Sequence, residues 1–193
     1  MKIENGFDVP LPPAEAWRVL LDIEGVAPCF PGAQILQAID ARTFRGKVAV
    51  RLGPVAVSFV GTAHLEEIDE ARRRVQVKAS GTEEKGRGGA QALVEFSLAQ
   101  TGPRATHVAI TTDLSLNGAV AQYGRGAAMI QDMAQQMVGR FAATLQTQIE
   151  GSETERQAAV AAAAKPVSGF SLFFGALWRA LRRLLHLGPS AAK

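Results

Sequence analysis

Few residues of this 193-residue chain combine a type and a spacing that could perform chemistry. The three histidines, His64, His107 and His186, lie far apart, and no spacing of His, Asp or Glu residues suggests a metal site. His64 and His107 alternate with apolar residues, which places both on the outward faces of strands, and we expect all three histidines to be solvated. Cys29 has no histidine near it in the sequence, so we interpret it as a small buried residue rather than a nucleophile. We therefore predict no catalytic residue and no metal ligand.

One glycine-rich segment, Gly86-Arg87-Gly88-Gly89, superficially suggests a phosphate-binding loop. A phosphate loop of this kind leads from a strand into a helix. Here the segment lies between two predicted strands, and we interpret it as the turn of a β-hairpin.

The elements that position a site follow from the period of the apolar residues. Residues 2–9 alternate and predict a strand, and residues 13–22 predict a short helix, with a second short helix and a turn behind it. From about 33 to 117 the period is two, which is typical of an antiparallel sheet with one wet face and predicts six strands in a meander. Residues 118–149 have a helical period.

This order of elements predicts an α+β fold of the helix-grip type. A curved seven-stranded antiparallel sheet wraps around a long C-terminal helix and encloses a space between the two. We assign residues 1–149 to this ligand-binding domain, residues 150–168 to a linker that is partly helical, and residues 169–193 to an amphipathic tail helix.

The faces expected to point into the enclosed space are nearly all apolar, with Asn5, Thr112 and Tyr123 as the few polar exceptions. An interior without an acid–base pair suits the binding of an apolar molecule rather than its transformation. The residues that we predict to line a cavity are Phe44, Phe59, Phe96, Tyr123, Ile130, Met133, Met137 and Phe141. Packing into an ordinary core is the simpler interpretation for most of them. It is weaker for the methionines, because flexible thioethers suit a surface that repacks around a ligand.

The formal net charge of +3 is unevenly distributed along the chain. Residues 165–193 hold five basic residues and no acidic one, whereas the other 164 residues hold 16 Lys and Arg against 18 Asp and Glu. A nucleic-acid-binding domain would itself carry the positive charge, so we expect no nucleic-acid partner. No apolar run follows Lys2, so we expect no secretory signal and a cytoplasmic location.

The C-terminal segment has one apolar half and one basic half when it is drawn as a helix. Three arginines interrupt it, whereas a membrane-spanning helix needs ~20 largely uncharged residues. A wide apolar arc with aromatic residues, opposite arginines, is typical of a helix that lies in the membrane interface. The residues that we predict to bind an anionic membrane are Phe170, Phe173, Phe174, Leu177, Trp178, Leu181, Leu184, Leu185, Arg179, Arg182 and Arg183. Docking of this helix on its own domain or on a partner protein is the alternative.

Short motifs in the domain resemble one protein family at matching spacings. They are Cys29-Phe30-Pro31-Gly32, Gly53-Pro54-Val55, Phe59-Val60-Gly61, and Asp113 leading to Gly118, Tyr123-Gly124 and the long helix. Together they are similar to the family of the carbon monoxide dehydrogenase G subunit, which belongs to the START/Bet v 1-like (SRPBCC) superfamily of helix-grip proteins. The resemblance covers about residues 1–148.

The resemblance implies an accessory, non-enzymatic role beside a molybdenum-containing carbon monoxide dehydrogenase or a related molybdenum hydroxylase. Members of that family recruit the enzyme to the membrane and are implicated in carrying a quinone for electron transfer. We therefore expect no covalent cofactor, a quinone (menaquinone or ubiquinone) as bound ligand, and a peripheral location on the cytoplasmic face of the inner membrane. The expected partners are the enzyme, the anionic membrane surface and the quinone. A polyketide cyclase-like enzyme on the same fold and a ligand-free membrane adaptor are the alternatives.

Overall fold

Seven strands form one antiparallel sheet in the computed structural model, which describes residues 1–52, 55–125 and 127–164. Their order across the sheet is β1-β7-β6-β5-β4-β3-β2, so β2 to β7 form a meander and β1 pairs with the last strand. The strands are β1 (Lys2–Val9), β2 (Ala33–Ala38), β3 (Thr43–Leu52), β4 (Val55–Asp69), β5 (Arg74–Glu83), β6 (Gly88–Gly102) and β7 (Ala105–Gly118). The predicted sheet is confirmed.

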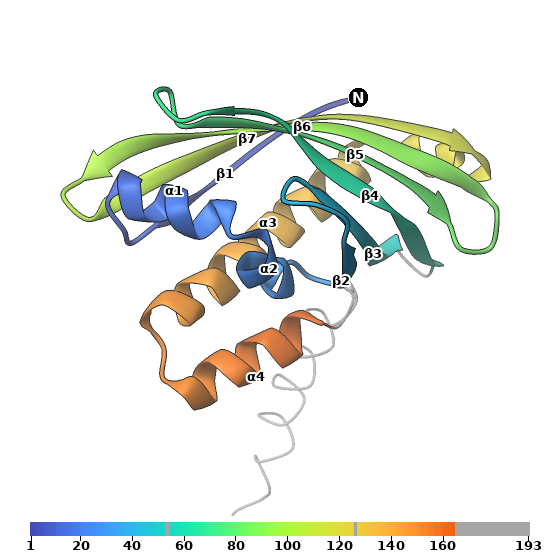
Figure 1. Cartoon of the computed structure of the whole chain (residues 1–193). Coiled ribbons are helices and arrows are strands. Elements are labelled where there is room, and N and C mark those ends of the chain that lie inside the picture. Colours follow the sequence, from blue (N-terminus) through green and yellow to red (C-terminus); the bar gives the residue numbers. More distant parts are fainter. Residues whose placement is uncertain (53–54, 126, 165–193) are drawn as a thin grey trace, which may run out of the picture.

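The sheet arches over one long helix, as Figure 1 shows. Two short helices precede β2 and lie on the same side of the sheet as the long helix, which itself has α4 against its other side. The helices are α1 (Pro13–Leu21), α2 (Ile23–Val26), the 3₁₀ helices η1 (Ala27–Cys29) and η2 (Ala119–Arg125), α3 (Ala127–Glu150) and α4 (Glu153–Ala163). This arrangement confirms the predicted helix-grip fold.

The alternation of the sequence holds across the sheet. Val48 lies opposite Phe59, and Val77 lies opposite Val94, so inward-facing residues of neighbouring strands meet on the face toward α3. Gly61 pairs with Gly81 across β4 and β5. A Cβ atom at Gly61 would collide with the backbone carbonyl of Ser80, so the close approach of these two strands requires glycine at this position.

Buried apolar side chains form two clusters between the sheet and the helices rather than one. The first cluster comprises Phe7, Val9, Leu11, Ala16, Trp17, Leu20, Cys29, Phe44, Leu65, Val75, Leu98, Val108 and Leu145. The second cluster comprises Ile3, Val50, Val57, Val120, Ile130 and Met137. Along α3 the boundary falls between Met137, in the second cluster, and Val138, which packs against the first.

The long helix begins later than the sequence pattern predicts. The predicted helix spans 118–149, but Gly118 ends β7 with φ of 65°, a 3₁₀ helix follows, and α3 begins at Ala127. Glycine costs about 1 kcal/mol relative to alanine inside an α-helix, and glycines stand at 118 and 124. The helical period of the apolar residues therefore continues through a segment whose backbone does not favour an α-helix.

The chain turns back after α3 and forms a further helix within the segment 150–168 that we interpret as a partly helical linker. The Glu155 carboxylate accepts hydrogen bonds from the backbone N–H and the hydroxyl of Ser152, at 2.8 and 2.7 Å, and caps the start of α4. At its end, Ala163 is buried, and its carbonyl accepts a hydrogen bond from the N–H of Gly32 at 2.8 Å. The described part of this segment is thus docked on the domain.

The β5–β6 hairpin is closed by a buried carboxylate. Glu83 is 2% exposed, and its two oxygens accept hydrogen bonds from the Arg87 guanidinium at 2.8 Å and from the backbone N–H groups of Lys85 and Arg87 at 2.9 and 3.2 Å. The glycine-rich segment 86–89 is therefore a hairpin turn, as the sequence predicts. The Arg87 side chain, with help from the two N–H groups, lowers the pKa of Glu83 to about 2.

This carboxylate makes the stability of the fold depend on pH in a defined direction, and its replacement should remove that dependence. The folded pKa lies below the ordinary value of 4.5, so ionised Glu83 stabilises the fold fully above pH 4.5 and progressively less as the pH falls towards 2. Glu83→Gln should lower the Tm at pH 7, and the difference from the native protein should shrink between pH 4.5 and 3. Thermal unfolding at both ends of this range measures it. The exposed Glu70→Gln variant is the control, and a constant Tm deficit for Glu83→Gln would contradict the argument.

Candidate functional site

A strip of small and polar residues crosses the inner face of the sheet between the two clusters. We call this strip the seam. It consists of Asn5 on β1, Thr112 on β7, Ala92 and Val94 on β6, Ala79 on β5, Gly61 and Ala63 on β4, and Gly46 on β3. Each of these residues is partly exposed although the face is the inner one, and the apolar side chains among them (Ala63, Ala79, Ala92 and Val94) pack in neither cluster. The middle of the inner face is therefore incompletely covered.

Backbone pairing makes the seam continuous. Ala63 pairs with Ala79, and Ala79 pairs with Ala92. Val94 pairs with Thr112, and Asn5 lies on the neighbouring strand, diagonal to Thr112. Because strands lie about 4.8 Å apart, a row across six of them is roughly 24 Å long. A long, narrow apolar molecule fits these dimensions better than a compact one.

The predicted cavity-lining residues lie on the two sides of the seam. Phe44, Phe96 and Phe141 belong to the first cluster or pack against it, and Phe59, Ile130, Met133 and Met137 belong to the second cluster or pack against it. Tyr123 is part of η2, and its side chain lies outside what the structure describes. The large residues thus form two walls, and contact of these residues with a ligand stays a prediction.

The small residues of the seam are not among the site residues that the sequence predicts. The alternation places Ala63, Ala79 and Ala92 on the inner face, yet only the backbone register puts them side by side in one row. A row of small side chains leaves space above it that large side chains would fill. The signal in the sequence is the recurrence of alanine and glycine at inward positions of neighbouring strands.

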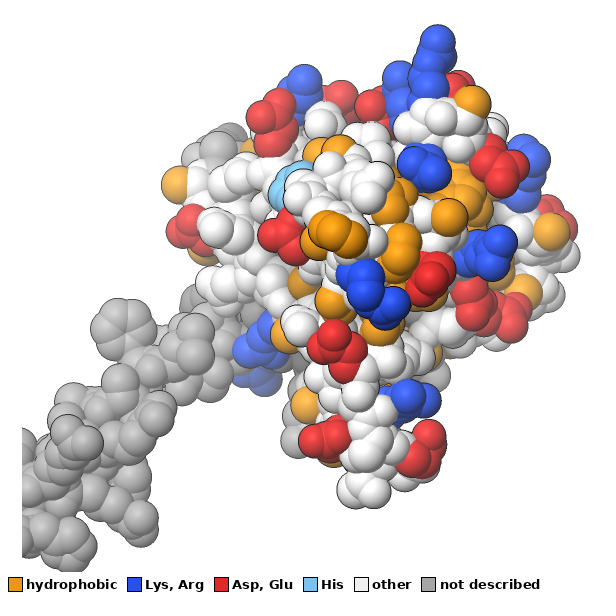
Figure 2. Space-filling view, turned by 90° about the vertical axis from the view of Figure 1, so that its left-hand side faces the viewer, with side chains coloured by type: hydrophobic (Ala, Val, Ile, Leu, Met, Phe, Trp, Pro, Cys, Tyr) orange, Lys and Arg blue, Asp and Glu red, His pale blue; other side chains and the backbone are white. Residues whose placement is uncertain are grey.

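The long helix covers the sheet unevenly. The backbone of α3 makes its most extensive approach to the sheet at β1, and a smaller one at β3. On the side of the molecule where α1 and the β6–β7 hairpin lie, apolar side chains reach the surface between charged side chains of both signs (Figure 2). A hollow of about 440 Å³ between α1, α2 and α3 is lined by Leu11, Val19, Val26, Leu145 and Ile149, among others.

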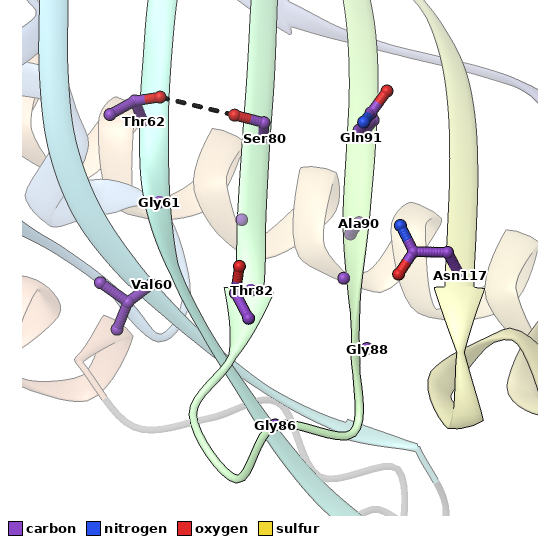
Figure 3. Close-up of a pocket in the computed structure, with 12 residues that line it drawn as sticks. Val60, Gly61, Thr62, Ser80, Thr82, Gly86, Gly88, Ala90, Gln91 and Asn117 are labelled. Atoms are coloured by element: carbon purple, nitrogen blue, oxygen red, sulfur yellow. Dashed lines mark hydrogen bonds between the residues drawn. The ribbon is translucent and has the colours of Figure 1, made fainter.

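The outer face of the sheet carries a hollow of a different character. It has a volume of about 480 Å³, and hydroxyl and amide side chains line it: Thr62, Ser80, Thr82, Gln91 and Asn117 (Figure 3). The hydroxyl oxygens of Thr62 and Ser80 lie 3.5 Å apart. Together with the glycines of the hairpin turn, these side chains make a polar surface, which does not suit an apolar ligand.

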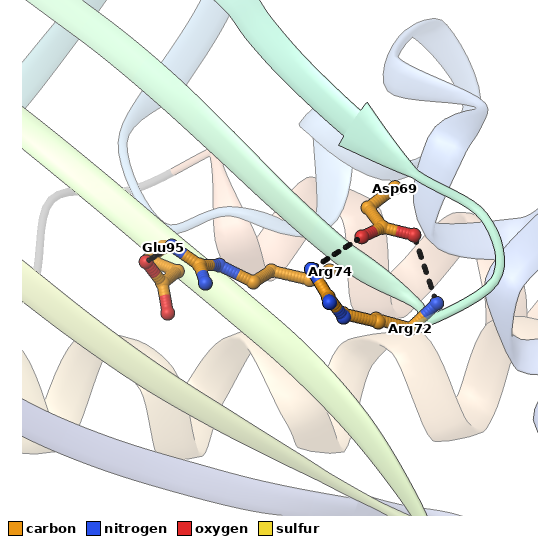
Figure 4. Close-up of polar contacts among 4 residues, drawn as sticks. All are labelled: Asp69, Arg72, Arg74 and Glu95. Carbon is orange, nitrogen blue, oxygen red and sulfur yellow. Dashed lines mark hydrogen bonds and ion pairs between the residues drawn. The ribbon is translucent and has the colours of Figure 1, made fainter.

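Charged groups of the strands also lie outside the seam. Arg74 and Glu95 form an ion pair of 2.6 Å between neighbouring strands, and Asp69 accepts a hydrogen bond of 2.9 Å from the N–H of Arg72 in the β4–β5 turn (Figure 4). Exposed pairs of this kind contribute about 0.2–1 kcal/mol each. The seam itself contains no ionisable side chain.

The described histidines lie on the outer face and make local contacts. His64 Nδ1 lies 2.9 Å from the Thr43 hydroxyl, and His107 Nδ1 lies 2.8 Å from an Asp8 oxygen. Within the described ranges, no three His, Cys, Asp or Glu side chains come together as they would to hold a metal ion. His186 lies outside these ranges.

Cys29 belongs to a structural junction. Its thiol donates a hydrogen bond of 2.6 Å to the side-chain carbonyl of Gln148 on α3, and the Gln148 amide donates to the carbonyl of Gly25 at 3.3 Å. The ring of Phe30 packs 6.1 Å from the ring of Phe141, and Gly32 turns the chain into β2 with φ of 72°. Burial raises the pKa of Cys29 to about 11, so the thiol is protonated at neutral pH.

The predicted membrane-binding residues, from Phe170 to Leu185, lie outside the described residues. In the part of the chain that is described, no helix is both long and apolar enough to cross a membrane.

A curved antiparallel sheet that grips one long helix is the START-like helix-grip fold, and solved structures share it. A conserved protein from Geobacillus kaustophilus is 17% identical with a TM-score of 0.67, over 77% of this chain and 95% of its own. A START superfamily protein from Mycobacterium smegmatis is 15% identical with a TM-score of 0.53, over 77% and 97%. A protein from Thermus thermophilus is 16% identical with a TM-score of 0.52, over 82% and 99%. These likenesses concern the fold alone.

The family model of the carbon monoxide dehydrogenase G subunit (CoxG) matches residues 6–150, and the chain belongs to this family. At the level of the family, this supports an accessory role with carbon monoxide dehydrogenase. The comparison with curated protein sequences finds no match.

The buried state of Cys29 predicts its reactivity. With a pKa of about 11 against an ordinary 9.0, its thiolate fraction at pH 8 is about a hundredth of that of a free thiol. Iodoacetamide should therefore alkylate the native protein at least 100-fold more slowly than the protein in urea, as measured by mass spectrometry. Ala109→Cys, on the exposed outer face of β7, is the matched control and should react rapidly without urea. Similar rates for Cys29 in both states would show that the thiol is accessible.

Proposed function

We propose that this protein binds a lipophilic quinone along the seam and recruits a molybdenum-containing carbon monoxide dehydrogenase, or a related molybdenum hydroxylase, to the cytoplasmic face of the inner membrane. In this proposal the protein is not an enzyme. It holds menaquinone or ubiquinone non-covalently and delivers it for electron transfer. Membership of the CoxG family supports the partner. The seam supports the ligand class.

The observation that carries the proposal is the incomplete cover of an apolar sheet face. Val94 projects from the inner face of β6, yet it is partly exposed and packs in neither cluster. Exposed apolar surface is unfavourable in water, and each buried CH₂ contributes about 0.8 kcal/mol. An isoprenoid chain that lies on Ala63, Ala79 and Ala92 would remove this surface from water. The flexible thioethers of Met133 and Met137 adapt to such a chain from one side.

The chemistry of the same surface favours binding over catalysis. General acid–base catalysis needs a titratable group within hydrogen-bond reach of the reacting atoms. The seam offers an amide and a hydroxyl, Asn5 and Thr112, and no ionisable side chain. Glu83, the last residue of β5, is ionised and accepts a hydrogen bond from the Arg87 guanidinium. These features argue against a cyclase-like activity.

The sequence of the tail supports the membrane part of the proposal. If the segment 169–193 is drawn as a helix, its three arginines fall opposite large apolar and aromatic residues, and residues 165–193 include no acidic residue. Each arginine close to an anionic leaflet contributes about 1 kcal/mol, and the apolar half adds burial in the interface. A tail of this kind would hold the domain at the surface where the quinone partitions.

Filling the seam tests the ligand. Ala79→Phe places a ring in the middle of the row, and the quinone that co-purifies with the protein should fall by at least tenfold. Lipid extraction and mass spectrometry of protein purified without detergent measure this. The matched control is Ala109→Phe, which adds the same ring on the exposed outer face and should retain the quinone.

Three results would separate the alternatives. A native protein that carries no quinone and binds none on addition would refute quinone binding and leave the adaptor role. Retention of the quinone in Ala79→Phe at the native level would place the ligand elsewhere. Turnover of an aromatic polyketide, lost in Ala79→Phe, would favour the cyclase.

Removing the tail tests membrane recruitment. Because α4 is docked on the domain through Ala163, the chain should be truncated after Ala164 so that the fold stays intact. The truncated protein should stay in the supernatant when it is centrifuged with vesicles that contain anionic phospholipid, whereas the full chain should pellet with them.

A charge variant of the full chain is the control for this experiment. Replacing Arg179, Arg182 and Arg183 by Gln should weaken binding to anionic vesicles on the order of 100-fold, and binding to neutral vesicles much less. Pelleting of the truncated protein at the level of the full chain would contradict the proposed role of the tail.

A further inference from the structure

Two polar side chains of the seam have no partner within the described protein. Asn5 and Thr112 point to the inner face, are partly exposed, and make no hydrogen bond to another described residue through their side chains. Because both residues are partly exposed, water can satisfy these groups in the free protein. A ligand that covers the seam would displace this water, and the two groups would then need hydrogen bonds from the ligand itself.

The surroundings of the pair are apolar. Asn5 stands between Ile3, of the second cluster, and Phe7, of the first, and Thr112 stands opposite Ile3 and Val94. The long helix lies close to β1 here, because the amide of Gln131 donates a hydrogen bond of 3.2 Å to the carbonyl of Glu4. The pair therefore sits at the β1 end of the seam, where α3 approaches the sheet most extensively.

We propose that Asn5 and Thr112 hold the oxygen-bearing head of the ligand, while its apolar chain runs along the alanine row toward β3. This inference rests on the proposed function and assigns its polar subsite. The backbone register supports it: the two residues are diagonal neighbours on adjacent strands, a spacing of about 7–8 Å that one carbonyl oxygen can bridge with a hydrogen bond from each side.

The types of the two residues suit both redox states of a quinone. An oxidised head offers carbonyl oxygens, which accept hydrogen bonds, and a reduced head offers hydroxyl groups, which also donate. The amide of Asn5 and the hydroxyl of Thr112 can each donate or accept, and neither carries a charge that must change. The subsite therefore holds the oxidised and the reduced head with similar affinity, which is what a carrier that loads in one state and unloads in the other requires.

The experiment uses the full chain with Asn5→Leu, Thr112→Val and the double variant. Isothermal titration calorimetry measures binding of ubiquinone with one isoprenoid unit, of its reduced form under anaerobic conditions, and of farnesene, a branched hydrocarbon without oxygen. Each single substitution should weaken both ubiquinone forms about fivefold, and the double variant about 20-fold, because a neutral hydrogen bond contributes modestly. Farnesene should bind all variants with equal or higher affinity. Thr111→Val, on the outer face of the same strand, is the matched control and should bind as the native protein does.

Thermal unfolding without ligand separates this role from a structural one. Replacing an unpaired polar group by an apolar group of similar shape should leave the Tm unchanged or raise it, whereas loss of a structural hydrogen bond would lower it. Unchanged ubiquinone affinity in the double variant would refute the head-group subsite while quinone binding to the seam survives. Failure of ubiquinone and farnesene to bind even the native protein would refute the proposed function itself. A preference of tenfold or more for one redox state would overturn the inference that the pair serves both.

Discussion

One geometric constraint governs this molecule: a single helix cannot cover the inner face of a seven-stranded sheet. Seven strands at about 4.8 Å spacing are roughly 29 Å wide, whereas a helix with its side chains is about 10–12 Å across. Helices α1 and α2 with η1 extend the cover at one end and produce the first cluster, and η2 with the first half of α3 produces the second. The centre is covered by neither, and the residues there are small. The seam is the consequence.

The position of α3 relative to the sheet determines how much of the seam is exposed. A junction at the end of α3, far from the centre of the sheet, fixes the position of this helix. The segment from Cys29 to Gly32 touches three elements at once: Gln148 on α3, the start of β2, and Ala163 on α4. Helix α4 packs against α3 from the side away from the sheet (Figure 1). The long helix is thus held from both sides, so the uncovered strip is a supported feature of the fold rather than a packing defect.

The sequence predicts much of this architecture because alternation is a strong constraint when one face of a strand is wet. Phe44, Phe59 and Phe96 all lie on the inner face as their parity predicts, since a shift by one residue would bury neighbours such as Arg45 and expose the aromatic rings. The predicted start of α3 is wrong, because helical spacing of apolar residues does not report the backbone cost of glycine at 118 and 124.

The seam could not be predicted from the sequence for a different reason. The alternation of residues along a strand predicts which face of the sheet a side chain lies on. Whether that side chain is buried depends on which helices pack against that part of the face. Ala79 and Val75 lie on the same face of the same strand, yet Val75 is fully buried and Ala79 is partly exposed. Only the positions of α1 and α3 distinguish the two residues. The packing of α4 on the domain could not be predicted either, because an alanine-rich segment has no strongly apolar face that would indicate a buried side.

An open strip has a thermodynamic advantage over a closed cavity for a molecule that must be released. At about 0.8 kcal/mol for each carbon, complete burial of four or five isoprenoid units would contribute about 16–20 kcal/mol, which approaches the limit of non-covalent affinity, and release would be slow. A strip that covers one side of the chain gives a fraction of that energy, so the ligand can exchange with a membrane. Specificity then falls to the few polar groups that recognise the head, because apolar contact discriminates weakly between chains of similar length. In the proposed complex, the alanines bind the apolar chain weakly enough for release. The two uncharged hydrogen-bonding groups at one end recognise the head. Different residues of one sheet face therefore provide reversible binding and specificity.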